Sequence, residues 1–210
     1  MSTNARCILF GFGDLGRELL AYLLTTSNYE QYFFYDDCLL ADQCIFGIDV
    51  VCLGTLSSCS QQPHSDYYLT ISDPSARLHV FNTFLQPQAI ELSSYIHPTA
   101  LVSRFSTIHK GSIIFPHVIV SHGVRLGCSC ILNGGSTIGH DVTVGDFSTV
   151  SANVNLGGHV KIMERVFIGL GASVLPEISI GESSWVGPNC TIYSNVKSGK
   201  KLFTRPPQKL

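Results

Sequence analysis

A six-residue period runs without a break through the second half of the chain. From residue 96 to residue 192 every sixth residue is Ile, Leu or Val, which makes seventeen consecutive positions. The residue four places after each of them is small or β-branched, and glycine often follows the aliphatic residue directly. The aliphatic positions are Ile96, Val102, Ile108, Ile114, Val120, Leu126, Leu132, Ile138, Val144, Val150, Leu156, Ile162, Ile168, Val174, Ile180, Val186 and Ile192. This repeat predicts a parallel β-helix, whose stacked coils bury the aliphatic side chains in ladders.

A different pattern, with short apolar runs and helical stretches in alternation, precedes residue 95. Buried strands are expected at residues 7–10, 32–35, 48–53 and 67–71, and a helix at residues 15–24. Asp73 and Pro74 resemble a helix start, and Leu78, Phe81 and Leu85 would share one face of the helix that follows. The order is that of βαβ units, which stack as a parallel sheet covered by helices.

The composition excludes several classes of protein. Of the 210 residues, 45% are hydrophobic and 13% are charged, and the formal net charge is −2. A buried core is therefore expected, whereas a basic surface for nucleic acid is not. No apolar run is long enough for a membrane span, and the first residues lack a signal-peptide pattern, so a cytoplasmic protein is expected. The eight cysteines include no Cys-x-x-Cys pair, which favours reduced thiols over disulfides, and no metal site is expected.

The repeat also carries a family resemblance. The hexads resemble the left-handed β-helix of the hexapeptide-repeat acyltransferases, in which three hexads form one coil. With a βαβ domain in front, the layout is similar to the NeuD and PglD type of sugar acetyltransferases, most closely at residues 95–100 (YIHPTA) and 132–145 (LNGGSTIGHDVTVG). The resemblance implies an α/β, Rossmann-like nucleotide-sugar-binding domain at residues 1–94. It further implies a left-handed parallel β-helix acyltransferase domain at residues 95–198 and a C-terminal tail at residues 199–210.

His140 is the candidate base. Asp141 follows it directly and Asn133 lies seven residues before it, so a carboxylate and an amide are available close to the imidazole. A carboxylate beside an imidazole fixes the tautomer and stabilises the imidazolium that forms when the ring takes a proton. Taken alone, the pair could equally decorate a solvent-facing corner. The resemblance implies that His140 is the general base, that Asp141 supports it and that Asn133 makes a polar contact.

Glycine-rich corners are the candidate acetyl-CoA site. The resemblance implies that the pantetheine arm contacts mostly main chain in a groove between subunits of a homotrimer, with active sites between the subunits. The residues concerned are Gly158, His159, Gly169, Gly171 and Ala172.

Two features depart from the family pattern. Thr149 stands where many relatives carry a second histidine. The tail lacks the common Gly-x-Pro-Ala-Lys ending, so Lys200, Lys201 or Arg205 is expected near the phosphates of CoA.

A glycine-rich loop is the candidate nucleotide site. The motif G-x-G-x-x-G at residues 11–16 follows a predicted strand and opens a predicted helix, a context that favours phosphate binding at the helix N-terminus. Asp36 and Asp37 end the next strand, from which a carboxylate reaches a ribose hydroxyl or a base edge. The predicted site residues are Gly11, Gly13, Asp14, Gly16, Asp36 and Asp37. A single βαβ half does not embrace a dinucleotide, so a nucleotide sugar fits better than NAD.

The sequence thus predicts an acetyl-CoA-dependent N-acetyltransferase. Its substrate would be the amino group of a UDP- or dTDP-linked 4-amino-4,6-dideoxy sugar, as implied by the resemblance, in the biosynthesis of surface-glycan precursors. Two alternatives stay open: O-acetylation of a sugar such as sialic acid, and a non-catalytic β-helix scaffold that only binds a nucleotide sugar.

Overall fold

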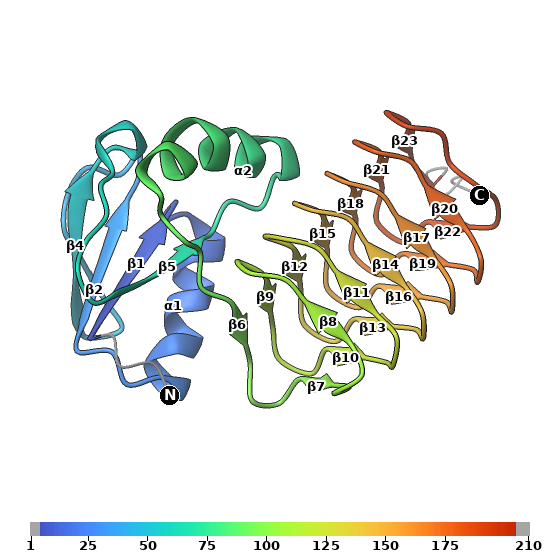
Figure 1. The fold of residues 1–210 in the computed structure, drawn as a ribbon, viewed down its shortest axis with the longest axis horizontal. Helices are drawn as coiled ribbons and strands as arrows, with labels where there is room; N and C mark the ends of the chain where they lie inside the picture. The colour runs from blue at the N-terminus through green and yellow to red at the C-terminus, as the bar shows by residue number, and fades with distance from the viewer. Residues whose placement is uncertain (1–4, 205–210) are drawn as a thin grey trace, which may run out of the picture. The chain divides into compact units, whose positions relative to one another are not determined.

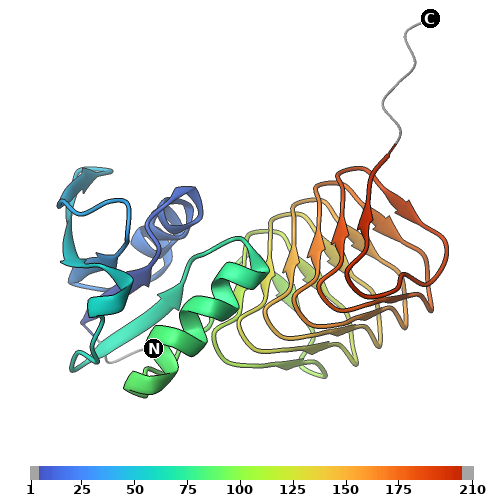
Figure 2. The ribbon, with the colours of Figure 1, turned by 90° about the horizontal axis from the view of Figure 1, so that it is seen from above.

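The structure, a computed structural model, describes residues 5–204. The chain divides into two compact units, residues 1–94 and residues 95–210. The first unit holds the helices and a five-stranded sheet, and the second is a stack of coils made of very short strands (Figures 1 and 2).

The sheet of the first unit contains a βαβ unit. Strand β1 (Arg6–Phe10), helix α1 (Asp14–Thr26) and strand β2 (Gln31–Tyr35) follow one another, and β1 pairs in parallel with both β2 and β5 (Ser65–Leu69). Residues 7–10 of β1 are all fully buried, which means that both faces of the sheet are covered. This explains why the strand appears in the sequence as a continuous apolar run.

The expectation of an all-parallel sheet needs a correction at one edge. The strand order is β3-β4-β2-β1-β5, and β3 (Gln43–Ile45) runs antiparallel to β4 (Ile48–Gly54). The two are joined by Phe46 and Gly47, whose φ angles of 54° and 79° are those of a tight hairpin turn. The turn reverses the chain within two residues, so β3 has no room for a crossover helix.

A second helical segment begins where the sequence predicts it. Helix α2 (Pro74–Val80) has Asp73 as its N-cap, and the Asp73 side chain accepts a hydrogen bond from the Ala76 N–H. It continues through a π-helical turn, η2 (Phe81–Leu85), and a 3-10 turn, η3 (Gln86–Gln88), and another 3-10 turn, η1 (Leu56–Ser58), precedes β5. Val80 and Leu85 pack in one core cluster with apolar residues of β1 and β5.

The second unit is a parallel β-helix. Each of the seventeen aliphatic positions ends a two-residue strand, as the hexad repeat predicts. The strands are β6 (Tyr95–Ile96), β7 (Leu101–Val102), β8 (Thr107–Ile108), β9 (Ile113–Ile114), β10 (Ile119–Val120), β11 (Arg125–Leu126), β12 (Ile131–Leu132), β13 (Thr137–Ile138), β14 (Thr143–Val144), β15 (Thr149–Val150), β16 (Asn155–Leu156), β17 (Lys161–Ile162), β18 (Phe167–Ile168), β19 (Ser173–Val174), β20 (Ser179–Ile180), β21 (Trp185–Val186) and β22 (Thr191–Ile192).

The strands stack into three parallel sheets, one on each side of the coil. One sheet runs from β7 to β22, the second from β8 to β20, and the third from β6 to β23 (Figure 1). Paired residues in neighbouring coils, such as Ile119 and Thr137, are three hexads apart in the sequence, so three hexads complete one coil. The aliphatic residues and the small residues four places later form one continuous buried cluster.

The β-helix extends beyond the boundary that the sequence predicts. Strand β23 (Lys201–Leu202) pairs with β21 inside the segment expected to be a tail, and Leu202 packs against the core. The paired residues Trp185 and Lys201 are closer in the sequence than three full hexads, by two positions. Because the last coil is shortened in this way, the six-residue register does not reveal it.

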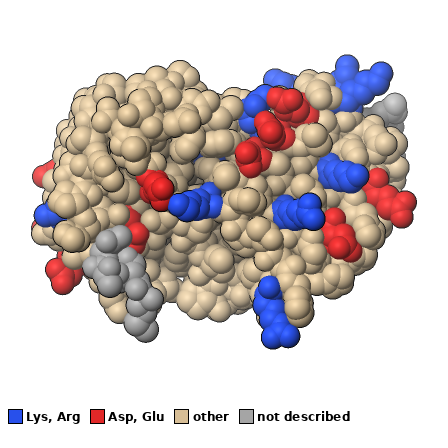
Figure 3. Space-filling view, in the orientation of Figure 1, with Lys and Arg blue, Asp and Glu red and all other residues tan. Residues whose placement is uncertain are grey.

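Charge and hydropathy of the surface agree with the sequence pattern. Acidic and basic side chains lie interspersed on the face of the described chain that Figure 3 shows. No helix within residues 5–204 is long and apolar enough to span a membrane.

Candidate active site

His140 lies at a corner of the β-helix, in the segment between β13 and β14. Because one coil takes three hexads, the same corner of the preceding coil holds His122 and Gly123, and that of the following coil holds Gly158 and His159. Backbone hydrogen bonds join these corners: the Asp141 N–H donates to the His122 carbonyl at 3.0 Å, and the His159 N–H donates to the His140 carbonyl at 2.9 Å. Residues far apart in the sequence are thus stacked at this corner.

The corner geometry makes room for the Asp141 carboxylate. Asp141 itself adopts a left-handed backbone conformation, with φ 58°, and lies over Gly123. A Cβ added at Gly123 would be 2.3 Å from Asp141 Oδ1, which is closer than any real contact. Glycine is therefore required at residue 123 if the carboxylate is to keep this position.

The His140 and Asp141 side chains are hydrogen bonded. His140 Nδ1 is 2.9 Å from Asp141 Oδ2. The hydrogen bond from His140, and secondarily the nearby imidazoles of His159, His122 and His140, lower the pKa of Asp141, although desolvation opposes them. An ionised carboxylate only accepts hydrogen bonds, so Nδ1 carries the proton and Nε2 has a free lone pair. The pair therefore has the tautomer that a general base needs.

Other rings hold the imidazole of His140 in place. The His122 ring stacks on it with centroids 5.5 Å apart, and the His159 ring meets it edge-on at 5.0 Å. A Cβ added at Gly158 would be 2.6 Å from His140 Nε2, so the glycine leaves the space that this nitrogen occupies. The side chains of His140 and Asp141 are 49% and 43% exposed in the single chain, which leaves them open to a substrate.

The predicted site residues of the β-helix fall at two different corners. Asn133 lies between β12 and β13, one corner before His140, and it stacks in the coil register with Ser151 and Gly169. Gly171 and Ala172 belong to that same corner. The Ala172 side chain is fully buried in the core, so a ligand could meet only its main chain. Gly158 and His159 are at the corner of His140, together with Asp141.

The glycine loop lies between β1 and α1. Gly11 has φ 90°, and its carbonyl would be only 2.5 Å from a Cβ added at Gly16, so Gly16 permits the close packing of α1 on the loop. Gly13 is the N-cap of α1 and makes no side-chain cap, and a Cβ added there meets nothing within 4 Å. The first N–H groups of α1, beginning at Asp14, have no partner inside the helix, which is the arrangement that binds an anion.

The two predicted acidic residues support the loops of the first unit. Asp36 Oδ2 accepts from the Phe12 N–H at 2.7 Å, and its Oδ1 accepts from the N–H groups of Cys38 and Leu39 at 2.8 and 3.0 Å. Asp37 Oδ1 accepts from the Leu56 N–H at 2.9 Å. The structure thus brings Asp36 to the glycine loop, as the motif predicts, and uses its carboxylate to hold that loop.

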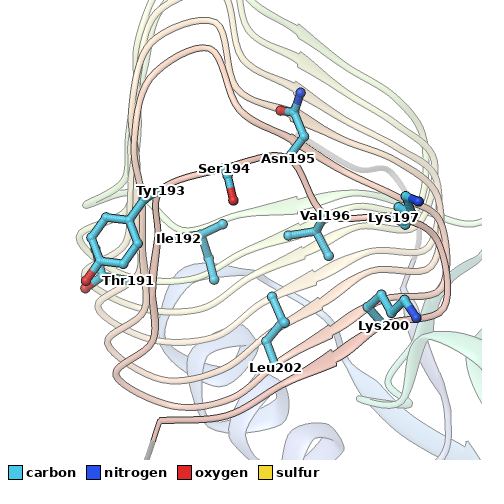
Figure 4. Close-up of a pocket in the computed structure, with 9 residues that line it drawn as sticks. All are labelled: Thr191, Ile192, Tyr193, Ser194, Asn195, Val196, Lys197, Lys200 and Leu202. Atoms are coloured by element: carbon cyan, nitrogen blue, oxygen red, sulfur yellow. The ribbon is translucent and has the colours of Figure 1, made fainter.

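A cavity of about 310 Å³ lies at the C-terminal end of the β-helix, remote from His140 along the stack. Its apolar lining comes from Ile192, Val196 and Leu202, and Lys197 and Lys200 lie together on one side of it (Figure 4). Lys201 is exposed on β23. Arg205, also expected near the phosphates of CoA, lies outside the described residues.

Sequence reasoning missed His122 and Gly123 as neighbours of the pair. Neither belongs to the local H-D motif, and each lies three hexads before His140 or Asp141. The coil length is the signal that would have found them, because it stacks residues from successive coils at one corner.

Comparison with solved structures shows the fold. The acetyltransferase domain of PglB from Neisseria gonorrhoeae FA1090 matches with a TM-score of 0.83 and 24% identity, over 94% of this chain and 96% of that one. PerB from Caulobacter crescentus, solved with CoA and GDP-perosamine, matches with a TM-score of 0.80 and 23% identity, over 93% and 92% of the two chains. WeeI from Acinetobacter baumannii AYE matches with a TM-score of 0.81 and 20% identity, over 93% and 94%.

The chain has the fold of these acetyltransferases. The likeness extends over both units, since it covers more than nine tenths of each chain compared. The PglB domain has also been solved in complex with acetyl coenzyme A, with a TM-score of 0.82. No protein-family model matches the sequence, and no curated protein sequence does.

Proposed function

We propose that the chain is an acetyl-CoA-dependent N-acetyltransferase that acts on the amino group of a nucleotide-linked amino sugar. The observation that carries the proposal is the His140–Asp141 pair, with Nδ1 held by the carboxylate and Nε2 open, at a half-exposed corner of a β-helix. PerB, which shares this fold, was solved with CoA and GDP-perosamine, and the PglB domain was solved with acetyl-CoA.

The reaction needs little chemical apparatus. The sugar amine attacks the thioester carbonyl of acetyl-CoA and forms a tetrahedral oxyanion, which a backbone N–H stabilises. His140 Nε2 takes the proton that leaves the nitrogen, and Asp141 stabilises the resulting imidazolium. Collapse of the intermediate breaks the carbon–sulfur bond, and the CoA thiolate leaves and recovers a proton. The products are the N-acetylated sugar and free CoA.

The first unit would bind the nucleotide part of the sugar. Gly13 and the first N–H groups of α1 are open to a pyrophosphate, and Asp36 and Asp37 lie at the end of β2. A 4-amino-4,6-dideoxy sugar linked to UDP or dTDP is the proposed substrate, and a GDP-linked sugar belongs in the same test because PerB was solved with one.

We infer a left-handed β-helix, a Rossmann-like first unit and a cytoplasmic homotrimer for the active protein. The support for an oligomer is the separation of the predicted site residues, since Asn133 and Gly169 lie at a different corner from His140. A site that uses both corners needs a second chain to complete it. Lys200 and Lys201 remain the proposed contacts of the CoA phosphates.

The test is thiol release from acetyl-CoA with UDP-, dTDP- and GDP-linked 4-amino-4,6-dideoxy sugars. His140→Ala is expected to lower kcat by about 10²- to 10⁴-fold, because a placed base contributes that much to the rate. His109→Ala is the matched control, since it removes an exposed imidazole from a different corner and should leave the rate unchanged.

Three outcomes would contradict the proposal. Equal rates for wild type and His140→Ala would place the base elsewhere. Turnover only with sugars that carry a free hydroxyl and no amine would indicate O-acetylation. Binding of nucleotide sugars without any thiol release would indicate a non-catalytic scaffold.

A further inference from the structure

Three metal-binding side chains converge at the corner of His140. A ring nitrogen of His140, a carboxylate oxygen of Asp141 and a ring nitrogen of His159 all lie within 4.8 Å of one another. Asp141 Oδ2 is 2.9 Å from His140 Nδ1 and 3.9 Å from His159 Nε2. The sequence predicts no metal site, because a full coil of chain separates His140 from His159 and only the closure of that coil brings them together.

The distances suit a small divalent cation. Zinc binds imidazole nitrogens and carboxylate oxygens at about 2.0–2.2 Å, so two of its ligands are separated by roughly 3.3 Å in a tetrahedral site. The observed separations lie on either side of that value, and small side-chain rotations would equalise them. All three side chains are about half exposed, which leaves the remaining coordination positions open to water.

The chemistry of the three ligands narrows the choice of cation. Two imidazoles and one carboxylate favour late first-row metals over Mg²⁺ and Ca²⁺, which prefer oxygen ligands alone. Asp141 supplies the negative charge. The stacked ring of His122 adds a third imidazole on the other side of His140, outside the group of three.

We propose that His140, Asp141 and His159 bind a late first-row divalent cation such as Zn²⁺, and that the bound cation inhibits the acetyltransferase. The inhibition, though not the binding, rests on the proposed function. A cation on Nδ1 replaces the proton there, so the neutral ring carries its proton on Nε2, the nitrogen that would act as base. A cation on Nε2 occupies the lone pair directly. In both cases the imidazole cannot accept the proton of the substrate amine.

Binding is tested with Zn²⁺ alone by calorimetry on the full chain. The measurements are made in a Cys38→Ser/Cys44→Ser background, because these exposed thiols would bind zinc themselves. One Zn²⁺ per chain is expected, and His159→Gln and His140→Gln should each weaken it by about tenfold or more, since each removes a ligand. His122→Gln and His109→Gln, matched imidazole losses outside the group, should keep the wild-type affinity.

Inhibition is tested on the same proteins with and without Zn²⁺, each rate divided by that protein's own metal-free rate. Zn²⁺ should inhibit the wild type reversibly, with full recovery on adding EDTA, and His159→Gln should need about tenfold more Zn²⁺ for the same inhibition. Absent binding, or binding that His159→Gln leaves intact, overturns the site. Stoichiometric binding with undiminished turnover overturns the inhibition. If the metal-free protein has no activity, the proposed function fails while the binding result still decides the site.

Discussion

At the scale of single residues, the candidate site depends on two glycines as much as on the pair itself. Gly123 leaves room for the Asp141 carboxylate, and Gly158 leaves room for the His140 ring. Each glycine lies one coil from the side chain that it accommodates, and is therefore three hexads away in the sequence. The chemistry of the H-D pair is thus set by the backbone of the coils before and after it.

Gly158→Ala tests this dependence. The added methyl would be 2.6 Å from His140 Nε2, so the ring has to move. We expect kcat to fall by about 10²-fold, because a displacement of about 1 Å costs that much in a positioned reaction. Unfolding followed by the fluorescence of Trp185, the only tryptophan, should show that the β-helix stays folded.

A double-mutant comparison separates positioning from other causes. If Gly158 acts through His140, Gly158→Ala should cost nothing further in a His140→Ala background. A full additional loss of the same size in that background would mean that the glycine acts on the substrate or on CoA instead.

At the scale of elements, each two-residue strand contributes one side chain to the core and one to the surface. Leu126 on β11 is fully buried, and its neighbour Arg125 is exposed. Both pair with residues of the coils above and below, so their backbone hydrogen bonding is equivalent. The difference between them lies in the side chain alone.

Leu126→Ala should therefore lower the free energy of unfolding by about 2–5 kcal/mol, because it leaves a cavity in the ladder. Arg125→Ala, on the same strand, should change it by at most about 0.5 kcal/mol. Chemical denaturation monitored through Trp185 measures both. Equal losses for the two variants would contradict the assignment of the buried face.

At the scale of the whole molecule, the two units divide the substrates under the proposed function. The first unit presents an uncapped helix N-terminus at Gly13, and the β-helix presents the base. The two sites should then respond separately to substitution, with changes in one affecting binding of the nucleotide and changes in the other affecting the chemical step.

Gly13→Asp provides the test. A Cβ at residue 13 has open space, and Asp is a favourable N-cap, so stability should hold or rise. The added negative charge should raise KM for the nucleotide sugar about tenfold through repulsion of its pyrophosphate, with KM for acetyl-CoA unchanged. Gly13→Ser, an equally good but neutral cap, should keep both KM values. A similar rise for both variants would indicate steric exclusion, and no rise would place the phosphates elsewhere.

Much of the molecule follows from the sequence by local rules. The aliphatic ladder from Ile96 to Ile192 determines the β-helix, because burial of one side chain in six leaves the chain few other regular structures. The strands, α1 and the Asp73 cap likewise follow from apolar runs and capping chemistry over a few residues. The H-D pair is visible for the same reason, since its members are adjacent.

Only the tertiary structure decided what surrounds that pair. His122, Gly123, Gly158 and His159 meet His140 and Asp141 because a coil closes after every third hexad, and the antiparallel β3 and the short last coil depend on turns of a few residues. The role of Asp36 was decided in the same way, since its carboxylate accepts the Phe12 N–H across the sheet. Periodicity states which side chains are buried, whereas contacts between coils and between strands depend on where the backbone returns in space.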